Sequence, residues 1–347
     1  MRAAWAKAGS KSISIVLALL FTALLLLASG ASPIESFRLI WQGSVGDGAK
    51  LADTLMAWVP LVLAASGLVV TFAAGLWNIG VEGQVVMGAI AAAFVAREFH
   101  AAPALIITVA LAAGVIGGLL WGLLAGMLRV FGKVNEIFGG LGLDFVATGM
   151  VVYLVIGPWK RAGIASTSGT DPFPREAWLP TIGDKLSPIA VILAVLAVVG
   201  VYFLMRGTFF GLRLKAVGAN AASAHIIGLS TRRYLLTAMA IGGGLAGLGG
   251  AVQAIGFQHK LVPAISGGYG FLGILVVLLA GYRAALIAPI AFFFMMISVG
   301  STQLSLRLGL NSSLGGVVQG TLVLLTVLVG GWQAQRARRR EPTEVES

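Results

Sequence analysis

The feature that most limits the fold of this chain is a series of long apolar segments. Several of them run without interruption for about 20 residues, the length at which a helix crosses a bilayer. Hydrophobic residues make up 58% of the 347 residues and charged residues only 11%. A soluble domain carries roughly 25% charged residues. The sequence therefore predicts an all-α, polytopic helical membrane protein.

We predict about ten transmembrane helices. In chain order they cover residues 13–29, 54–75, 85–96, 104–128, 134–156, 188–205, 234–256, 267–282, 284–300 and 314–331. The first segment also fits a cleavable signal peptide, but we favour a retained span because a further membrane domain follows. With the N-terminus inside, most of the 24 Lys and Arg residues fall on the cytoplasmic side, as the positive-inside rule requires.

This topology predicts three regions and two important loops. Residues 1–12 form a cytoplasmic N-terminus, residues 13–331 a single transmembrane domain, and residues 332–347 a basic cytoplasmic tail. The loop 206–233 lies inside. The loop 157–187 lies outside and carries four prolines, which suits either a surface for an external partner or a simple connector.

Two of the predicted spans are too short to cross a bilayer alone. Segments 85–96 and 267–282 follow the Gly-punctuated polar stretches NIGVEGQ and PAISGGYG. Broken or re-entrant helices are tolerated at membrane depth when they are buried in protein or line a cavity, and a pair of them indicates a transport pathway. The candidate pathway residues at these breaks are Asn78, Glu82, Gln84, Tyr269 and Phe271.

The roles of these residues have alternatives. Glu82 and Gln84 are either substrate contacts or gate and backbone-capping residues. Tyr269 and Phe271 either stack on a sugar or base, or simply pack. Asp144 lies in the middle of a span, where an acid is costly. We place Asp144 on the pathway as an acceptor for substrate hydrogen bonds; the alternative is a buried structural partner.

The segment from Arg206 to Tyr234 is a polar island with several basic residues and no acidic residue. Asn220 is a good N-cap, residues 221–227 favour a helix, and Gly228 can end that helix in a left-handed conformation. So short a helix persists only when it docks on something. It is either a docking site for a soluble partner on the cytoplasmic side or part of a basic loop that sets the membrane topology.

Glycines at a spacing of four predict close helix packing. Gly114, Gly118, Gly122 and Gly126 lie on one face of a span, and Gly243 and Gly247 repeat the spacing later. No phosphate-binding loop or hydrolase motif is present, which argues against an enzyme. The chain has no cysteine and only three scattered histidines, so neither a metal nor a cofactor is expected. The net charge of +11 flanks the apolar spans and does not indicate nucleic acid.

Three motifs resemble one known family. They are GLRLKAVGANAASAHIIGLS at 211–230, GLWNIGVEGQVVMGA at 75–89, and VNEIFGGLGLDFVA at 134–147 followed by GPWK. They resemble permease subunits of bacterial ABC importers for simple sugars, nucleosides and branched-chain amino acids, the nucleoside-type branch most of all. The resemblance spans roughly residues 50–330. The acid at Asp144 departs from the Asn that is usual in that branch, which leaves the exact substrate open.

The resemblance implies a subunit that forms the pathway of an ATP-driven importer for a nucleoside or simple sugar, working by alternating access. In that family the short cytoplasmic helix sits in a groove of the ATPase subunit. The corresponding coupling residues are Arg213, Lys215, Gly218, Asn220, Ala221, His225 and Gly228. The implied partners are an ATPase subunit that binds the ATP, a second permease subunit, an extracytoplasmic substrate-binding protein and the lipid bilayer. The implied location is the bacterial cytoplasmic membrane. The alternatives are an ion-coupled secondary transporter and a membrane scaffold.

Overall fold

A computed structural model describes residues 20–338, except residues 22, 25, 29, 162, 164–167, 184 and 310–312. All regular structure in these residues is helical, apart from two isolated β-bridges. The all-α prediction is therefore confirmed. The predicted N-terminal region 1–12, most of the first span and the tail beyond residue 338 lie outside the described residues.

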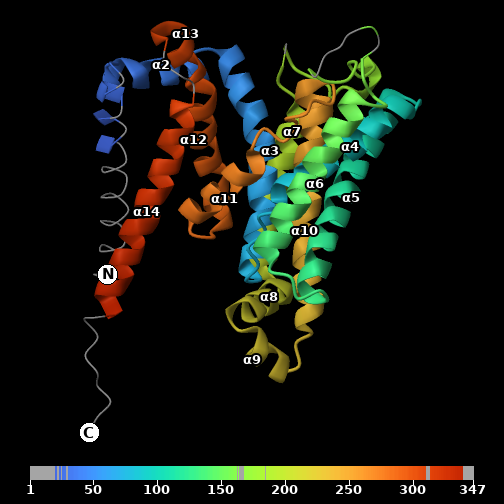
Figure 1. The fold of residues 1–347 in the computed structure, drawn as a ribbon, viewed down its shortest axis with the longest axis vertical. Coiled ribbons are helices and arrows are strands. Elements are labelled where there is room, and N and C mark those ends of the chain that lie inside the picture. Colours follow the sequence, from blue (N-terminus) through green and yellow to red (C-terminus); the bar gives the residue numbers. More distant parts are fainter. Residues whose placement is uncertain are drawn as a thin grey trace. The chain divides into compact units, whose positions relative to one another are not determined.

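The helices follow one another with mostly short connections, apart from the loop 157–187 between α6 and α7 (Figure 1). In chain order they are α2 (Pro33–Val45), α3 (Gly48–Ala73), α4 (Val81–Glu98), α5 (Pro103–Val130), α6 (Glu136–Ile156), η1 (Arg175–Ala177), α7 (Pro188–Gly207), α8 (Phe209–Ala219), α9 (Ala221–Ile226), α10 (Thr231–Val252), η2 (Gln253–Gln258), α11 (Tyr269–Ala280), η3 (Ala284–Leu286), α12 (Ile287–Gly300), α13 (Thr302–Leu308) and α14 (Leu314–Arg338).

Six of the described helical segments are long and apolar enough to cross a membrane. They are residues 48–73, 103–130, 136–156, 188–207, 231–258 and 284–308. The chain is thus a multi-pass membrane protein, and the predicted number of about ten spans is not confirmed. Helix α11 and residues 314–329 are apolar but shorter.

Two helices begin at positions that the sequence placed differently. Helix α4 begins at Val81, four residues before the predicted span, and has 18 residues instead of 12. Glu82 and Gln84 therefore belong to its first turns and not to the break, which is the short turn from Ala74 to Gly80. Helix α11 begins at Tyr269 and has 12 residues. Polar side chains near the start of α4 find hydrogen-bond partners inside the protein, so they do not end the helix.

The described residues divide into two compact units. One consists of the described residues up to Thr54 and from Phe293 onward, and the other of the described residues between Leu55 and Phe292. In the first, Leu39 and Ile40 of α2 pack with Leu304 of α13. The Gln319 side chain of α14 donates a 2.6 Å hydrogen bond to the Phe294 carbonyl of α12. The buried Gln319 side chain thus has an acceptor on a helix of the same unit.

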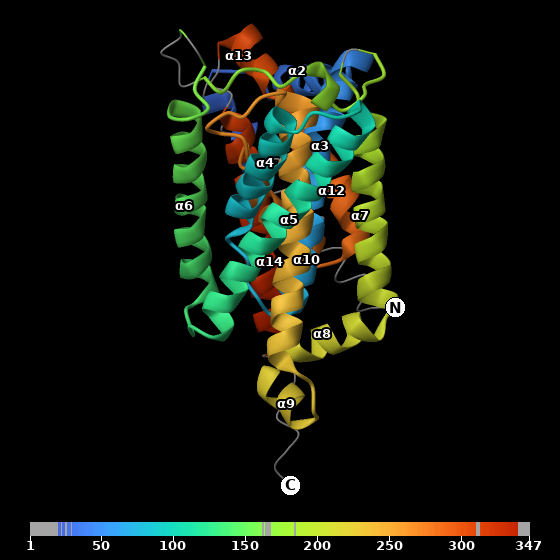
Figure 2. The ribbon, with the colours of Figure 1, turned by 90° about the vertical axis from the view of Figure 1, so that its right-hand side faces the viewer.

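The centre of the second unit is the packing of α4, α5 and α10 (Figure 2). A methyl group at Gly118 would overlap the carbonyl oxygen of Gly243, and one at Gly114 or Gly243 would meet backbone or a Cβ of the facing helix in the same way. Gly88 of α4 likewise lies against Gly247. The predicted glycine faces therefore meet one another. Backbone approach of this kind holds helices together where apolar burial offers no driving force.

The predicted external loop is attached to the far end of α10. The helix continues there as a π-helix, η2, and the backbone carbonyl groups at its end have no backbone partner within the helix. Amide groups of the loop satisfy them: Leu179 donates to Ile255 at 3.0 Å and Phe173 donates to His259 at 2.7 Å. The rings of Trp178 and His259 stack with centroids 3.8 Å apart. The loop is therefore joined by hydrogen bonds to the helix that starts beside α9.

Candidate functional site

The first break is closed by a pair of amide side chains. The Asn78 amide nitrogen donates to the Gln84 oxygen at 3.0 Å, and the Gln84 nitrogen donates back to the Asn78 oxygen at 2.9 Å. Both side chains are buried. Two neutral groups that satisfy each other in a dry interior cost little, whereas either alone would cost roughly 1–3 kcal/mol. The pair fixes the turn that connects α3 to α4.

Glu82 connects the first break to the second. Its Oε1 accepts a 3.1 Å hydrogen bond from the Gly268 amide, and its Oε2 accepts a 2.7 Å bond from the Gly270 amide. These amides lie at the start of α11, where the first N–H groups of a helix have no partner within the helix. Gly268 has a φ of +75°, which glycine adopts readily. A buried carboxylate from α4 therefore caps α11.

Asp144 caps the start of α4, as Glu82 caps the start of α11. Its Oδ1 accepts a 2.7 Å hydrogen bond from the Gly83 amide in the first turn of α4. A Cβ at Gly83 would lie 2.7 Å from that oxygen and 3.0 Å from Trp121 Nε1. Among the described residues, Asp144 Oδ2 and Trp121 Nε1 are buried without a hydrogen-bond partner. Asp144 lies on the buried face of α6. An acid of α6 therefore caps the start of α4, and an acid of α4 caps the start of α11, which links the three helices.

The two aromatic candidates differ in their surroundings. The Tyr269 ring is buried and packs against Gly267, where a Cβ would lie 3.1 Å from the ring. Phe271 is 45% exposed. The structure therefore gathers Glu82, Asp144 and Tyr269 around the starts of α4 and α11, with Phe271 as the outward-facing member. Their predicted contact with a substrate remains a prediction.

The short helix after α8 has the predicted caps. The Asn220 side chain accepts a 3.0 Å hydrogen bond from the Ser223 amide, α9 runs from Ala221 to Ile226, and Gly228 has a φ of +85°. Asn220 also ends α8, so one residue joins the two helices. Ile226 and Ile227 are 84% and 72% exposed, an apolar pair on a surface that favours a partner.

The other predicted coupling residues fall into two groups. Arg213 is exposed on α8, and Ala221 and His225 are exposed on α9. Lys215 instead donates a 2.6 Å hydrogen bond to the Met205 carbonyl at the end of α7. Gly218 lies against the backbone after α3, because a methyl group there would overlap the Ala73 carbonyl. Helix α8 thus rests directly on the turn that forms the first break.

Some residues at the junction were not identified from the sequence. Gly83 and Gly270 let carboxylates approach the backbone, since a Cβ at Gly270 would lie 2.5 Å from Glu82 Oε2. Trp121 lies in a predicted span for which the glycine spacing was the only feature that the sequence analysis interpreted. The one available signal was the repeated pattern of a glycine beside an acid or aromatic residue. No three His, Asp or Glu side chains of the described residues gather as metal ligands would.

Comparison with known proteins identifies the family. The family model described as "Branched-chain amino acid transport system / permease component" matches residues 51–327. The chain belongs to this family. As a permease component it is not itself an enzyme. The matched region includes both breaks, Asp144 and α9.

Curated relatives agree with this assignment. The permease is 28% identical over 335 residues to a glucose ABC transporter permease protein of Haloferax volcanii, covering 93% of this chain and 88% of the relative. It is 29% identical to the guanosine ABC transporter permease protein NupP of Bacillus subtilis, covering 90% of each. It is 28% identical to the nucleoside ABC transporter permease protein NupB of Lactococcus lactis, covering 83% of this chain and 82% of the relative. The permease is thus similar to ABC transporter permeases for sugars and nucleosides.

Proposed function

We propose that this chain is the membrane-spanning subunit of an ATP-driven importer that carries a nucleoside or a simple sugar into a bacterial cell. The relatives named above transport glucose, guanosine or nucleosides according to their names. The observation that carries the proposal is α9, a capped and exposed short helix that continues into α10 on one side and α8 on the other. A separate ATPase subunit hydrolyses the ATP and binds α9.

The contacts of α8 supply a route for the force. ATP-driven closure of the ATPase subunits moves α9, and Asn220 passes the movement to α8 because it caps both helices. Gly218 of α8 presses on the backbone from Ala73 to Gly75, directly before the Asn78–Gln84 pair. The junction around Glu82 and Asp144 then changes between inward-open and outward-open arrangements. A second permease subunit completes the pathway, and a binding protein delivers cargo at the loop 157–187.

The ion-coupled alternative is less well supported. Such carriers use intramembrane acids to bind protons or cations. Here Glu82 accepts a backbone amide hydrogen bond at each of its oxygens and Asp144 accepts one at Oδ1, which gives each acid a structural task. An external energy source fits this arrangement better than an ion gradient.

The exposed isoleucines of α9 provide the test. Ile226→Glu with Ile227→Glu should abolish co-purification of the ATPase subunit and stop uptake, while membrane insertion is unchanged. Both side chains are largely exposed, so the folding of the permease is not at stake. Ile182→Glu on the predicted external loop, 69% exposed, is the matched control and should leave ATPase association unchanged. Normal ATPase association of the double variant would refute the docking role of α9.

A further inference from the structure

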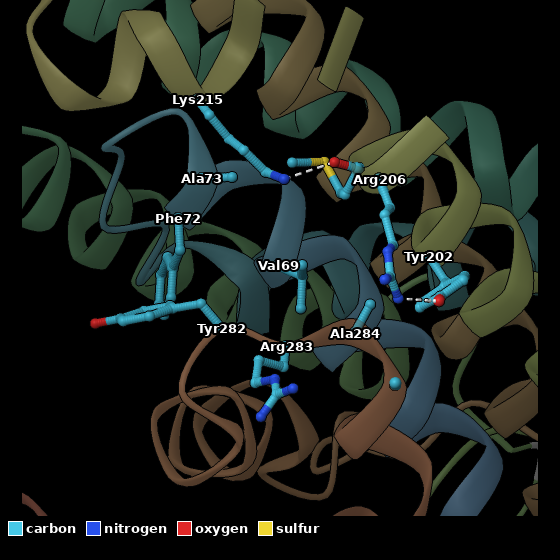
Figure 3. A pocket seen from close by; sticks show the side chains of 11 residues that line it. Val69, Phe72, Ala73, Tyr202, Arg206, Lys215, Tyr282, Arg283 and Ala284 are labelled. Carbon is cyan, nitrogen blue, oxygen red and sulfur yellow. Dashed lines mark hydrogen bonds between the residues drawn. The ribbon is translucent and has the colours of Figure 1, made fainter. Parts of the chain in front are cut away.

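A basic pocket lies in the second unit where α3, α7, α8 and the turn after α11 meet (Figure 3). Its volume is about 520 Å³. Arg206, Lys215 and Arg283 line it together with the rings of Phe72, Tyr202 and Tyr282. The described residues that line it include no acid. The pocket therefore combines three positively charged side chains with a wall of aromatic and aliphatic side chains.

The three cations are not neutralised within the described part of the chain. Lys215 donates to a backbone carbonyl, and Arg206 donates to the Tyr202 hydroxyl while its guanidinium lies 5.6 Å from that ring. Arg283 has no side-chain partner among the described residues. Three cations held around one cavity repel one another, and an anion placed between them would remove that repulsion.

The position of the pocket along α7 places it at the level of lipid head groups. Helix α7 is an apolar span of 20 residues, and Arg206 lies in its last turn. Helix α8 runs across the end of this unit instead of continuing the span (Figure 2), and it exposes the apolar side chains of Phe209 and Leu212. A short helix with exposed apolar residues and a lysine at the end of a span is typical of the membrane interface.

An apolar track leads from the pocket toward the centre of the membrane. Leu196, Val199 and Phe203 are exposed on α7. Their spacing of three and four residues places them on one helix face, and Arg206 lies on the same face three residues further. A lipid whose phosphate lies at Arg206 could therefore place an acyl chain along this face.

We propose that this pocket binds the phosphate of an anionic phospholipid, with an acyl chain along Leu196, Val199 and Phe203. Arg206, Lys215 and Arg283 contact the phosphate, and the Tyr202 ring lies beside Arg206. The inference uses the proposed function only for the side of the membrane, since it puts the site in the cytoplasmic leaflet, where anionic lipids attract basic residues.

The test measures lipid retention by the full complex. The permease, purified with its partner subunits, is exposed to vesicles of dioleoylphosphatidylglycerol or dioleoylphosphatidylcholine, and bound lipid is counted by native mass spectrometry. The variant with Arg206→Gln, Lys215→Gln and Arg283→Gln should bind phosphatidylglycerol about 100-fold more weakly, at roughly fivefold for each cation. Phosphatidylcholine retention should not change.

Two further variants isolate the pocket from general surface charge. Lys133→Gln, Arg232→Gln and Arg233→Gln remove the same charge from exposed positions outside the pocket and should retain phosphatidylglycerol normally. Ala285→Phe keeps all three cations, fills the pocket and should release the lipid. The single variant Arg283→Gln, on a turn and without a partner to lose, should weaken binding about fivefold even if the triple variant does not fold.

Three results would overturn the proposal. Equal losses in the pocket and control triples would show that only net charge matters. Displacement of the lipid by millimolar inorganic phosphate would assign the pocket to a soluble phosphate. Burial of Arg206 by the second permease subunit would make the pocket a protein interface. Lipid retention does not require ATP or α9, so loss of ATPase association in the Ile226 and Ile227 variant, with lipid binding intact, keeps the two proposals separate.

Discussion

Glu82→Gln is the most informative change, because one carboxylate joins the two breaks. Each Glu82 oxygen accepts one amide hydrogen bond from the start of α11. Glutamine keeps the size of the side chain but has only one oxygen. Its NH₂ group would face the second amide as donor against donor. The variant therefore loses one charge-assisted bond and leaves a buried N–H group without an acceptor.

The expected cost follows from the burial of the site. A hydrogen bond to a charged group contributes roughly 1.5–3 kcal/mol, and an unsatisfied buried donor costs about 1–3 kcal/mol. These contributions overlap, so we expect local opening of α11 to become easier by roughly 2–4 kcal/mol. At about 1.4 kcal/mol for each factor of ten, that is a roughly 30- to 700-fold loss of protection against hydrogen exchange.

The assay is hydrogen exchange with mass spectrometry on the purified complex. Peptides from residues 263–280 should exchange faster in Glu82→Gln, whereas peptides from the glycine-packed part of α5 should not change. Glu98→Gln is the matched control, since it removes the same charge from the exposed end of the same helix. If both variants give the same protection of α11, the capping role of Glu82 is refuted.

Three other outcomes follow from the described contacts. Asp144→Ala should expose the start of α4 to exchange and reduce uptake about tenfold, because the buried Gly83 amide loses its acceptor at a cost of about 1–3 kcal/mol, whereas Asp144→Asn keeps the acceptor and should restore protection. Gly118→Ala should lower the melting temperature of the complex by several degrees because its methyl group overlaps the facing carbonyl; Gly142→Ala, which meets open space, should not, and equal shifts would contradict the packing argument. Burial lowers the pKa of His259 despite its hydrogen bond to a carbonyl, so the unfolded chain binds the proton more readily. The attachment of the external loop should be strongest above about pH 6.5 and weaken below it, seen as faster exchange of residues 168–182, and His259→Gln should remove this pH dependence.

Local features of the fold could be predicted because their causes are local. Apolar runs give the approximate positions of the long helices. Asn220 and Gly228 give both ends of α9, since a cap acts within a few residues. The spacing of Gly114 and Gly118 gives the packing face of α5 without knowledge of its neighbour.

The junction could not be predicted because its partners are distant in the chain. Glu82 caps amides 186 and 188 residues away, and no pattern in the sequence joins them. Glu82 was interpreted either as a substrate contact or as a gate or backbone-capping residue. The structure shows the capping hydrogen bonds, and contact with a substrate stays a prediction. Asn78 and Gln84 were expected on a pathway, but they bind each other. Their contact with cargo stays a prediction.

The glycine contacts between α5 and α10 have a consequence for motion. Where two backbones touch with no side chain between them, there is no rotamer to change and no second arrangement to switch into. Helices α4, α5 and α10 should therefore travel as one block through a transport cycle. Any hinge must lie at its margins, in the turn before α4 and at the start of α11.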